Sequence, residues 1–536
     1  MRGLLLAATV FAASLLAGGE DRPVPNANQL ERIRSEFEIY GIVHWGLNTY
    51  TDSEWGYGDE DPALLAPDAF DADQIVGACK AGGIEGLVVV AKHHDGFCLW
   101  PTKTTEHNVS RSPFRGGKGD YVREMSDACR RAGVRFGVYV SPWDRNCAAY
   151  ATDRYVPLYH EQIRELLRGD YGDVFEMWFD GANGGDGYYG GACEKRKIPA
   201  DYYRFDEVFA FVRALQPKVC IFCGERTAEF RWPGNERGFL PDDSRATVDG
   251  HFRIAEADFP LRPGWFYHAA HDGAVKSGEY LMNRYLSAVG NGGTMDIGIA
   301  PDPHGRLHAN DVAALRRFTE VRARFFATRV ADPREGFNVV VLREDVARGE
   351  RIDGWELLAD GQPVFAGTAV GIKRIRVADE LLKAASVDFR VTKAAVNPGK
   401  VTVELFRADP ELVRAVKSAT AVPKGYRSLS GATCVAKGRD FLTWRLPEEK
   451  TFSSLVLMPD PKDPSGTPVE FALRFAVTDG KWSEPTKVFR LGNVAANPVP
   501  QQITLGAAQK ARYIRLDVRR TLNEGAKPSL RGLSPR

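Results

Sequence analysis

The chain has 536 residues, of which 44% are hydrophobic and 26% charged, so it has room for two to four domains of about 100–200 residues each. Its 71 lysines and arginines almost balance its 70 aspartates and glutamates. Because the basic residues are scattered and the formal net charge is only +1, the composition excludes the basic surface expected of a nucleic-acid-binding protein.

The first residues have the pattern of a secretory signal peptide. Arg2 gives a positive start, Leu4 to Leu16 is an apolar run too short to cross a bilayer, and residues 17–19 are small. We expect residues 1–19 to be removed and the mature protein to be periplasmic or secreted. Gly19 stands where a lipoprotein carries cysteine, and no later apolar run reaches about 18 residues, so neither a lipid anchor nor membrane insertion is expected.

Between about residues 38 and 325, short β-rich runs alternate with amphipathic stretches. We predict strands at 40–46, 84–91, 134–141, 173–179, 218–224 and 293–299. We predict helices at 72–81, 120–132, 155–168, 202–215, 279–289 and 310–323. This alternation indicates parallel βαβ units, and no G-x-G-x-x-G follows the first strand. We therefore predict an α/β fold in which residues 20–328 form a (β/α)8 barrel, with a doubly wound sheet as the alternative.

After about residue 330 the pattern changes to short alternating segments separated by turn residues. Such segments occur at 337–343, 372–377, 387–392 and 400–405, and again at 453–458, 469–477 and 511–518. This pattern is typical of a β-sandwich. We predict one sandwich over residues 329–410 and a second over residues 411–536.

Eight cysteines in a chain of this length do not indicate a disulfide framework. Cys220 and Cys223 form a C-x-x-C within a strand-like run, where residues three apart face opposite sides. We expect neither a metal nor a redox role for this pair. One or two disulfides in an exported protein stay open.

Polar and ionisable residues gather just after the predicted strands. All ten histidines lie between His44 and His308, and His44, His93, His94 and Asp180 each follow a strand. The carboxyl ends of barrel strands meet on one face, where catalytic residues are found. His93 and His94 are adjacent and should point to opposite faces, and no third ligand stands at a familiar spacing, so we expect no metal site and no cofactor.

The barrel segment also contains seven of the ten tryptophans. Core packing accounts for some of them. Others stand beside the histidine and aspartate candidates, where an aromatic face suits the apolar C–H face of a sugar ring. The seven are Trp45, Trp55, Trp100, Trp143, Trp178, Trp232 and Trp265.

At these residues the chain resembles the retaining α-L-fucosidases of glycoside hydrolase family 29. The resemblance covers the whole barrel segment and is carried by the runs Ile42–Gly46, Lys92–Trp100, Gly137–Arg145 and Met177–Ala182. The run Phe179–Tyr189 and the Ser-Pro-Trp-Asp-Arg motif are most like the branch that cleaves α-1,3- and α-1,4-linked fucose. The last segment resembles a discoidin-type carbohydrate-binding module only in the run Ala511–Leu516.

The resemblance implies a role for two carboxyl groups. Asp180 would be the nucleophile that attacks the anomeric carbon, and Glu236, in Arg-Trp-Pro-Gly-Asn-Glu, would be the general acid/base. Glu225 and Glu229 lie on the same loop and are alternatives to Glu236.

The resemblance also implies substrate-binding residues. His44, His93 and His94 would bind fucose hydroxyls, and Tyr139 would approach the ring near the nucleophile. Aromatic walls would be formed by Trp55, Trp178 and Trp265, and an apolar wall suits the methyl group of fucose. His268, in the run 265–268, would also lie in the site.

Two segments depart from the family pattern. The segment Glu225–Phe230 replaces the usual Gly-Pro-Asp, so the loop that carries the acid is altered. The run Ile297–Pro301 replaces a Leu-Asn-Val-Pro-Pro pattern, and its Gly298 takes the place of an asparagine that supports the eighth strand. We expect local repacking there.

The resulting hypothesis is an exported retaining exo-α-L-fucosidase. It would hydrolyse terminal α-1,3- or α-1,4-linked L-fucose from oligosaccharides or glycoconjugates by double displacement, so its partner would be a fucosylated glycan. Three alternatives stay open: a glycan-binding protein that has lost catalysis, a fucosidase of broader specificity acting on α-1,2 linkages and aryl fucosides, and a metal-dependent hydrolase using His93 and His94. The sequence does not predict an oligomeric state.

Overall fold

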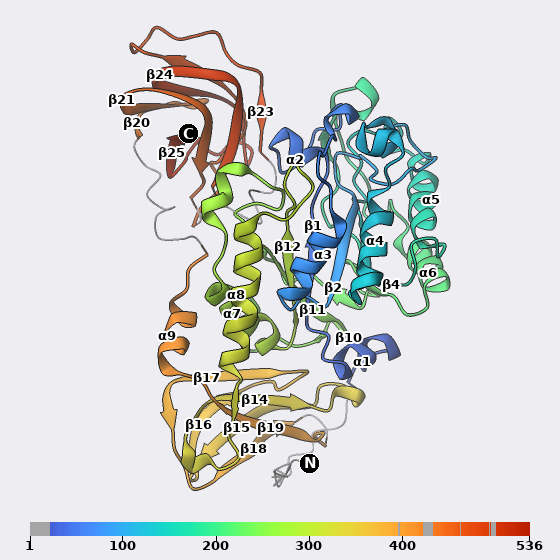
Figure 1. The fold of residues 1–536 in the computed structure, drawn as a ribbon, viewed down its shortest axis with the longest axis vertical. Coiled ribbons are helices and arrows are strands. Elements are labelled where there is room, and N and C mark those ends of the chain that lie inside the picture. Colours follow the sequence, from blue (N-terminus) through green and yellow to red (C-terminus); the bar gives the residue numbers. More distant parts are fainter. Residues whose placement is uncertain (1–21, 395–396, 422–431, 461, 492–493, 495–499) are drawn as a thin grey trace.

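A computed structural model describes residues 22–394, 397–421, 432–460, 462–491, 494 and 500–536 (Figure 1). The predicted signal peptide, residues 1–19, lies outside this part of the chain. Among the described residues, no helix has both the length and the apolar character that a membrane crossing requires.

The predicted (β/α)8 barrel is confirmed, because eight parallel strands close on themselves in the order β1-β12-β11-β8-β7-β4-β3-β2. Every neighbouring pair in this order is parallel, as expected when helices connect the strands. The strands are β1 (Ile39–Val43), β2 (Gly86–Lys92), β3 (Arg135–Val140), β4 (Val174–Trp178), β7 (Cys220–Phe222), β8 (Phe230–Arg231), β11 (Ile254–Pro260) and β12 (Thr294–Ile299).

Two barrel strands, β8 and β11, are absent from the sequence prediction. β8 has only two residues, too few for a periodic signal. β11 carries Glu256 and Asp258 among its apolar residues, and both carboxyl groups are buried. Charged residues are rarely fully buried, so a strand that contains two of them does not read as a buried strand from sequence.

The predicted helices occur within a few residues of their expected bounds, and they surround the barrel (Figure 1). Several begin at a side-chain cap: the carboxylates of Asp71 and Asp120 and the hydroxyl of Ser277 each accept a hydrogen bond from a first-turn N–H. These helices are α3 (Ala72–Ala81), α4 (Tyr121–Ala132), α5 (Tyr155–Leu167), α6 (Phe205–Leu215), α7 (Gly278–Ala288) and α8 (Ala309–Phe325). Before and after β1 stand α1 (Ala27–Arg34) and α2 (Leu47–Thr51).

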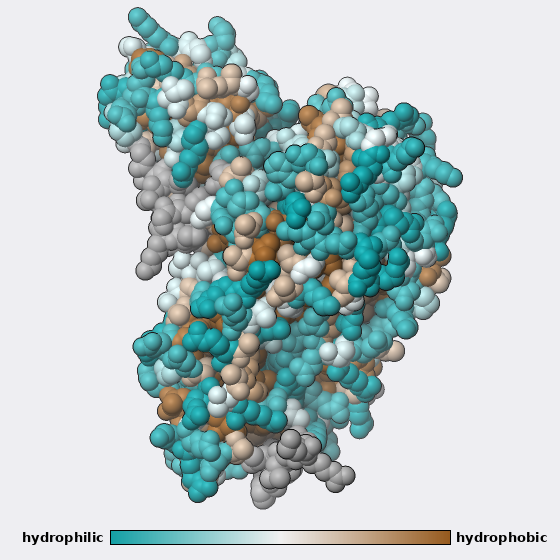
Figure 2. Space-filling view, in the orientation of Figure 1, coloured by the Kyte–Doolittle hydropathy of each residue, from teal (hydrophilic) through white to brown (hydrophobic). Residues whose placement is uncertain are grey.

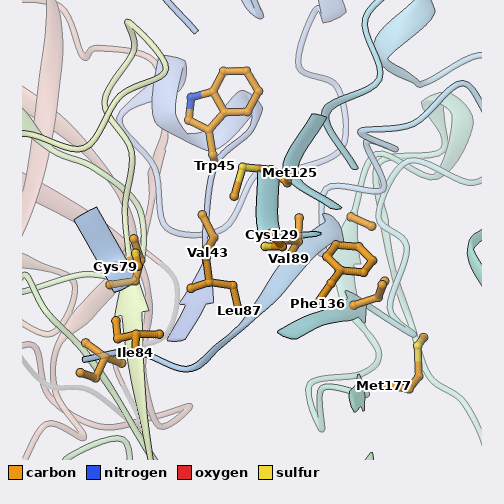
Figure 3. Packing of buried hydrophobic residues seen from close by; sticks show 14 of the residues in the cluster. Val43, Trp45, Cys79, Ile84, Leu87, Val89, Met125, Cys129, Phe136 and Met177 are labelled. Carbon is orange, nitrogen blue, oxygen red and sulfur yellow. The ribbon is translucent and has the colours of Figure 1, made fainter. Parts of the chain in front are cut away.

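The main apolar core lies between the strands and these helices. Figure 3 shows Val43, Leu87 and Val89 of the strands packed toward Met125 and Cys129 of α4. All five side chains are fully buried. This layer holds the barrel rigid, so the loops at the strand ends are presented on a fixed frame.

A middle β region follows the barrel, over residues 328–407, and consists of two sheets. One has the order β13-β19-β14-β17 and the other β16-β15-β18. They share an apolar core that contains Trp355 and Phe389. The region lies at the amino-terminal end of the barrel strands, next to α1 (Figure 1). Its strands are β13 (Thr328–Arg329), β14 (Phe337–Glu344), β15 (Ile352–Ala359), β16 (Gln362–Gly367), β17 (Arg374–Leu382), β18 (Val387–Ala394) and β19 (Val401–Arg407).

The chain then passes through α9 (Pro410–Ser418) to a further β structure, here called the last sheet. Its described residues form one six-stranded antiparallel sheet with a separate apolar core around Trp444 and Phe471. It lies at the opposite end of the barrel, close to α2 (Figure 1). Its strands are β20 (Thr433–Lys437), β21 (Phe441–Met458), β22 (Pro468–Ala476), β23 (Phe489–Arg490), β24 (Gln501–Thr521) and β25 (Gly532–Pro535). The domain boundaries and the discoidin-type assignment stay predictions.

The outer surface in the view of Figure 2 is mainly hydrophilic, with apolar residues scattered over it. This distribution is ordinary for a protein surface exposed to water. The described residues of this face therefore offer no binding patch, and the candidate site lies among the buried polar residues at the strand ends.

Candidate active site

A cavity of about 930 Å³ lies where the carboxyl ends of the barrel strands meet. This volume is near the upper end of the roughly 300–1,000 Å³ found for ligand pockets. All nine residues selected from the sequence line it: His44, Trp55, His93, His94, Tyr139, Trp178, Asp180, Glu236 and Trp265.

The carboxylate of Asp180 stands just after β4 and is held by both of its oxygens. The hydroxyl of Tyr139 donates to Oδ2 at 3.1 Å, and the backbone N–H of Ala182 donates to Oδ1 at 2.6 Å. The Nε2 atom of His94 lies 4.0 Å from Oδ2. Burial raises the pKa of Asp180, whereas the two donated hydrogen bonds favour the charged form. The carboxylate is thus oriented toward the cavity, as a nucleophile requires.

Of the three glutamates considered as the acid, only Glu236 is among the described residues that line the cavity. Its Oε2 accepts a hydrogen bond from the indole N–H of Trp265 at 2.9 Å. Glu225 is exposed. Glu229 is buried elsewhere, where it pairs with Arg213 at 2.8 Å and accepts from Asn26 at 3.0 Å.

A third carboxyl group, Asp258 on β11, lines the cavity and has no counterpart among the predicted site residues. Burial raises its pKa well above the usual range, and the negative charges of Glu236 and Asp296 act in the same direction. Burial and these neighbouring charges therefore favour the neutral form of Asp258 beside Glu236. An acidic residue within a barrel strand could have pointed to Asp258 from the sequence, but β11 was not predicted as a strand.

The three predicted histidines gather around Asp180 and Tyr139. The ring centroids of His93 and His94 lie 4.2 Å apart, and the ring of His93 stacks on Tyr139 at 5.9 Å. The expectation that His93 and His94 point to opposite faces is wrong, because β2 ends at Lys92 and strand geometry does not govern them.

These histidines are neutral near neutral pH. Burial lowers the pKa of His44 to about 3 and lowers the pKa values of His93 and His94 well below their usual range. A neutral imidazole has one hydrogen-bond donor and one acceptor, which suits a hydroxyl group. In His94, Nδ1 is paired with the hydroxyl of Ser141 at 2.7 Å, and Nε2 is the nitrogen nearer Asp180.

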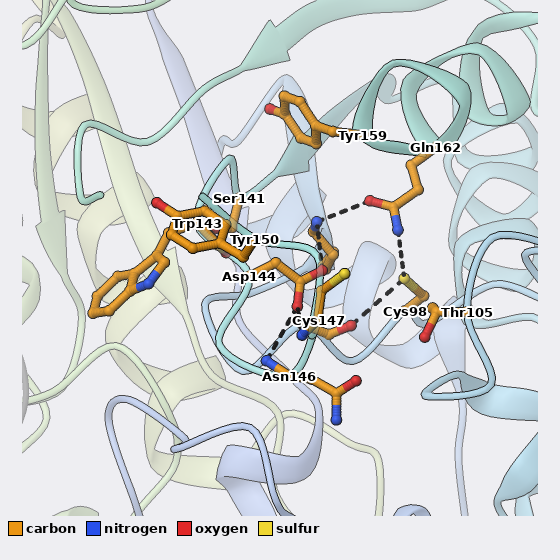
Figure 4. Close-up of polar contacts among 12 residues, drawn as sticks. Cys98, Thr105, Ser141, Trp143, Asp144, Asn146, Cys147, Tyr150, Tyr159 and Gln162 are labelled. Carbon is orange, nitrogen blue, oxygen red and sulfur yellow. Dashed lines mark hydrogen bonds and ion pairs between the residues drawn. The ribbon is translucent and has the colours of Figure 1, made fainter. Parts of the chain in front are cut away.

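A buried polar network supports the loop after β3 (Figure 4). The ammonium of Lys92 donates to Gln162 at 2.8 Å and lies 3.3 Å from Asp144. The other oxygen of Asp144 accepts from the backbone N–H groups of Asn146 and Cys147 at 3.1 and 2.9 Å. Because each charge in this buried group is paired, the loop has a fixed shape.

Aromatic rings form the walls of the cavity. Trp178 stacks on Phe222 with centroids 4.0 Å apart, and its N–H donates to the buried Glu256 at 2.8 Å. Trp55 meets His94 edge to face at 5.0 Å. The side chain of Trp232 is 42% exposed and also lines the cavity, which adds an aromatic face that was not selected as a site residue.

Gly298 explains how Trp265 fits against the barrel. A Cβ atom added at Gly298 would lie 2.6 and 2.7 Å from two ring carbons of Trp265, closer than real Cβ contacts. The indole therefore occupies space that the asparagine of the family pattern would need. At Gly298 the indole of Trp265 packs directly against β12, and its N–H donates to Glu236. The expected repacking relative to the family stays a prediction.

His268 is buried but is not among the described lining residues; it lies between two carboxylates behind Trp265. Its ring nitrogens lie 2.5 Å from Asp52 and 2.7 Å from Glu54. Burial alone would lower its pKa, but the hydrogen bonds and charges of these carboxylates raise it to about 9. Glu54 also accepts from the backbone N–H of Trp265 at 2.8 Å. His268 is therefore charged and positions Trp265 through Glu54.

All eight cysteines, each of them within the described residues, are free. Cys220 and Cys223 are buried, and burial raises the pKa of each thiol to about 12. Both are therefore uncharged packing residues at neutral pH.

Comparison with known proteins points to one family. A family model described as "Alpha-L-fucosidase" matches residues 26–321. An Arabidopsis thaliana protein named "Alpha-L-fucosidase 1" is 30% identical over 70% of this chain and 86% of its own length. The crystal structure of a glycoside hydrolase 29 family member from an unknown rumen bacterium superposes with a TM-score of 0.69 at 32% identity, over 96% of this chain and 99% of that one. This chain therefore belongs to the α-L-fucosidases of glycoside hydrolase family 29.

Proposed function

We propose that this α-L-fucosidase is a retaining exo-enzyme that removes terminal α-1,3- or α-1,4-linked L-fucose. One arrangement carries the proposal: Asp180 and Glu236 line the same cavity, among neutral histidines and aromatic walls. Retaining and inverting glycosidases both need two carboxyl groups in one site. The retaining pathway follows from the family resemblance of the two carboxylate segments.

In the first step the Asp180 carboxylate attacks the anomeric carbon of fucose. The bond from that carbon to the leaving oxygen breaks, and Glu236 gives its proton to that oxygen. Tyr139 and the N–H of Ala182 hold the attacking carboxylate in one orientation. Neutral His44, His93 and His94 offer donors and acceptors to the sugar hydroxyls.

In the second step Glu236, now ionised, takes a proton from a water molecule. The resulting hydroxide attacks the anomeric carbon, the bond to Asp180 breaks, and fucose leaves with its original anomeric configuration. The donor from Trp265 orients Glu236 in both steps. Both carboxyl groups return to their starting protonation states.

The linkage and the location are further parts of the proposal. The run Phe179–Tyr189 and the Ser-Pro-Trp-Asp-Arg motif support α-1,3/4 linkages, because they resemble that branch of the family. The charged start, apolar run and small residues at 1–19 support export. N-terminal sequencing of the protein released from expressing cells tests export, since cleavage near residue 19 is expected.

The enzyme proposal is tested with Lewis-type trisaccharides and an aryl fucoside. Fucose should be released from both, and NMR of the first product should show the α-anomer. Release from α-1,2 linkages and aryl fucosides but not from branched trisaccharides would indicate the broader specificity. An initial β-anomer would contradict the retaining pathway.

The role of Glu236 is tested by Glu236→Gln. Loss of the acid should slow the trisaccharide far more than an aryl fucoside whose leaving group needs no proton. Glu225→Gln is the matched control, because its side chain is exposed outside the cavity. If the control loses more activity than Glu236→Gln, the acid is wrongly assigned.

A glycan-binding protein without catalysis is the second candidate. It is favoured by one observation, the altered segment Glu225–Phe230 before the loop of Glu236. Tight binding of fucose with no turnover of any fucoside would establish it.

A further inference from the structure

The cavity has a second wall that does not come from the barrel. Its floor and one side belong to the barrel, and the facing side is made of residues from the last sheet. The polar members of this second wall are Glu470 on β22, Arg490 on β23, and Arg520 and Glu524 at and after the end of β24. The last sheet, which follows Glu236 by more than 200 residues along the chain, thus lines the same cavity as Glu236.

Three of these side chains form a group that faces the barrel. Glu470 lies 3.8 Å from Arg490 and 3.7 Å from Arg520, counted between the nearest nitrogen and oxygen atoms. Arg490 also lies 3.8 Å from Asp186 and stacks over the ring of Tyr57 at 4.2 Å, both on barrel loops. Direct hydrogen bonds are about 2.7–3.2 Å long, so these are loose ion pairs, and their nitrogen and oxygen atoms keep the capacity to bond a hydroxyl group.

The last sheet is fixed against the barrel by contacts around the cavity. The hydroxyl of Thr504 on β24 donates to Asp52, which also pairs with His268. Ala274 of the barrel and Val456 of β21 are buried together in one small apolar cluster. The second wall is therefore held in place, as specific binding of a flexible glycan requires.

The position and charge of this wall indicate what it binds. Fucose attached at Asp180 would occupy the floor among the histidines, so the rest of a cavity of about 930 Å³ is left for the sugars on the leaving oxygen. The described lining carries six acidic against four basic side chains, so it has no positive excess for an anionic glycan. Alternating carboxylates and guanidinium groups suit neutral hydroxyl groups, and Trp232 offers an aromatic face.

We propose that the last sheet supplies the subsite for the leaving part of the substrate, with Arg490, Glu470 and Arg520 binding hydroxyl groups of a neutral, branched oligosaccharide. This inference rests on the proposed fucosidase function, which it extends from the cleaved sugar to the rest of the glycan. It makes these three residues determinants of specificity rather than of chemistry.

The test uses Arg520→Ala in the full chain, with kcat/KM measured on a neutral Lewis-type trisaccharide and on an aryl fucoside. The ratio of the trisaccharide value to the aryl value should fall about 10- to 100-fold, the usual effect of losing a hydrogen bond from a charged group. Arg519→Ala is the matched control, because Arg519 is the preceding residue of β24, is exposed, and should keep the wild-type ratio.

The outcomes separate this inference from the fucosidase function. An unchanged ratio in Arg520→Ala, or an equal loss in Arg519→Ala, overturns the subsite while leaving the fucosidase standing. If the wild-type chain hydrolyses neither substrate, the fucosidase function fails. Calorimetric titration of the same trisaccharide into the wild-type and Arg520→Ala chains then tests the subsite. Weaker binding to Arg520→Ala is expected, and equal binding to both chains would overturn the subsite.

A further titration checks the chemical class. A sialylated version of the trisaccharide should bind Asp180→Ala more weakly than the neutral one, because the lining has no positive excess. Tighter binding of the sialylated glycan would overturn the proposal that the subsite takes a neutral oligosaccharide.

Discussion

The two β structures that follow the barrel lie at opposite ends of it and have different relations to the site. The middle β region contacts the amino-terminal ends of the barrel strands, where Lys373 pairs with Glu38 just before β1. None of its described residues lines the cavity. The last sheet lies at the carboxyl ends and provides a wall of the cavity. In barrel enzymes the active site lies at the carboxyl ends of the strands. A domain packed against the amino-terminal ends can therefore only stabilise the barrel, whereas one packed against the carboxyl ends can also line the substrate site.

The interface of the middle β region is built for stability. Arg374 is fully buried, and its guanidinium donates to the carbonyl oxygens of Ala369, Asp242 and Ser244 at 3.0, 3.2 and 2.8 Å. The last sheet instead presents partly exposed charged groups to an open cavity. The predictions below use this contrast, from the largest expected effect to the smallest.

The largest effect should follow loss of Asp180, the proposed nucleophile just after the carboxyl end of β4. Asp180→Ala should lower kcat on an aryl fucoside by about three orders of magnitude or more, and added azide should restore part of it. The control is Asp173→Ala, because Asp173 is exposed and directly precedes the same strand at its other end. Equal activity of the two variants would remove Asp180 from the mechanism.

The next effect concerns stability at the opposite end of the barrel. Arg374→Ala should lower the free energy of unfolding by about 3 kcal/mol, since one buried and two partly buried carbonyl groups lose their donor and the guanidinium leaves a cavity. Chemical denaturation measures this, and Arg348→Ala, an exposed change in the same region, should have almost no effect. The ratio of kcat/KM for trisaccharide to aryl fucoside should not change. A changed ratio would show that the middle β region also shapes the substrate site.

A pH-dependent effect is expected where the last sheet meets the barrel. The pKa of His268 is raised from 6.5 to about 9 in the folded state. Its contribution to stability is therefore fully present below pH 6.5 and is lost as pH rises through 9. From this shift it amounts to about 3 kcal/mol. Thermal unfolding of wild type and His268→Gln should differ at pH 6 and converge near pH 10. A difference that does not vary with pH would exclude a charged His268.

The smallest effect tests the close contact between β12 and Trp265. Gly298→Ala places a methyl group against the indole and Pro260, so it should cost about 1–3 kcal/mol of stability. It should also lower kcat, because the indole N–H would shift away from Glu236. Gly77→Ala on α3 is the control, since its Cβ would meet nothing within 4 Å. An unaltered kcat in Gly298→Ala would show that Trp265 does not orient Glu236.

Much of the site was predictable because it depends on a regular fold. Once alternating strands and helices are recognised as a barrel, the residues after each strand must converge, and this brings His44, His93 and Asp180 together without any further information. Glu236 required the family resemblance, since the two-residue strand before it gives no periodic signal. The roles of these residues stay predictions.

The sequence by itself determined six of the eight barrel strands, the helices around them and the polar residues that follow those strands, because local periodicity encodes them. The tertiary structure alone decided three things: that β11 brings Asp258 beside Glu236, that two carboxylates raise the pKa of His268 behind Trp265, and that Arg490 and Arg520 line the cavity. Each of these depends on groups that are distant along the chain and on how deeply folding buries them. Burial and charges that are distant along the chain shift pKa values, and contacts between distant segments complete the cavity. No local pattern of residues records either effect.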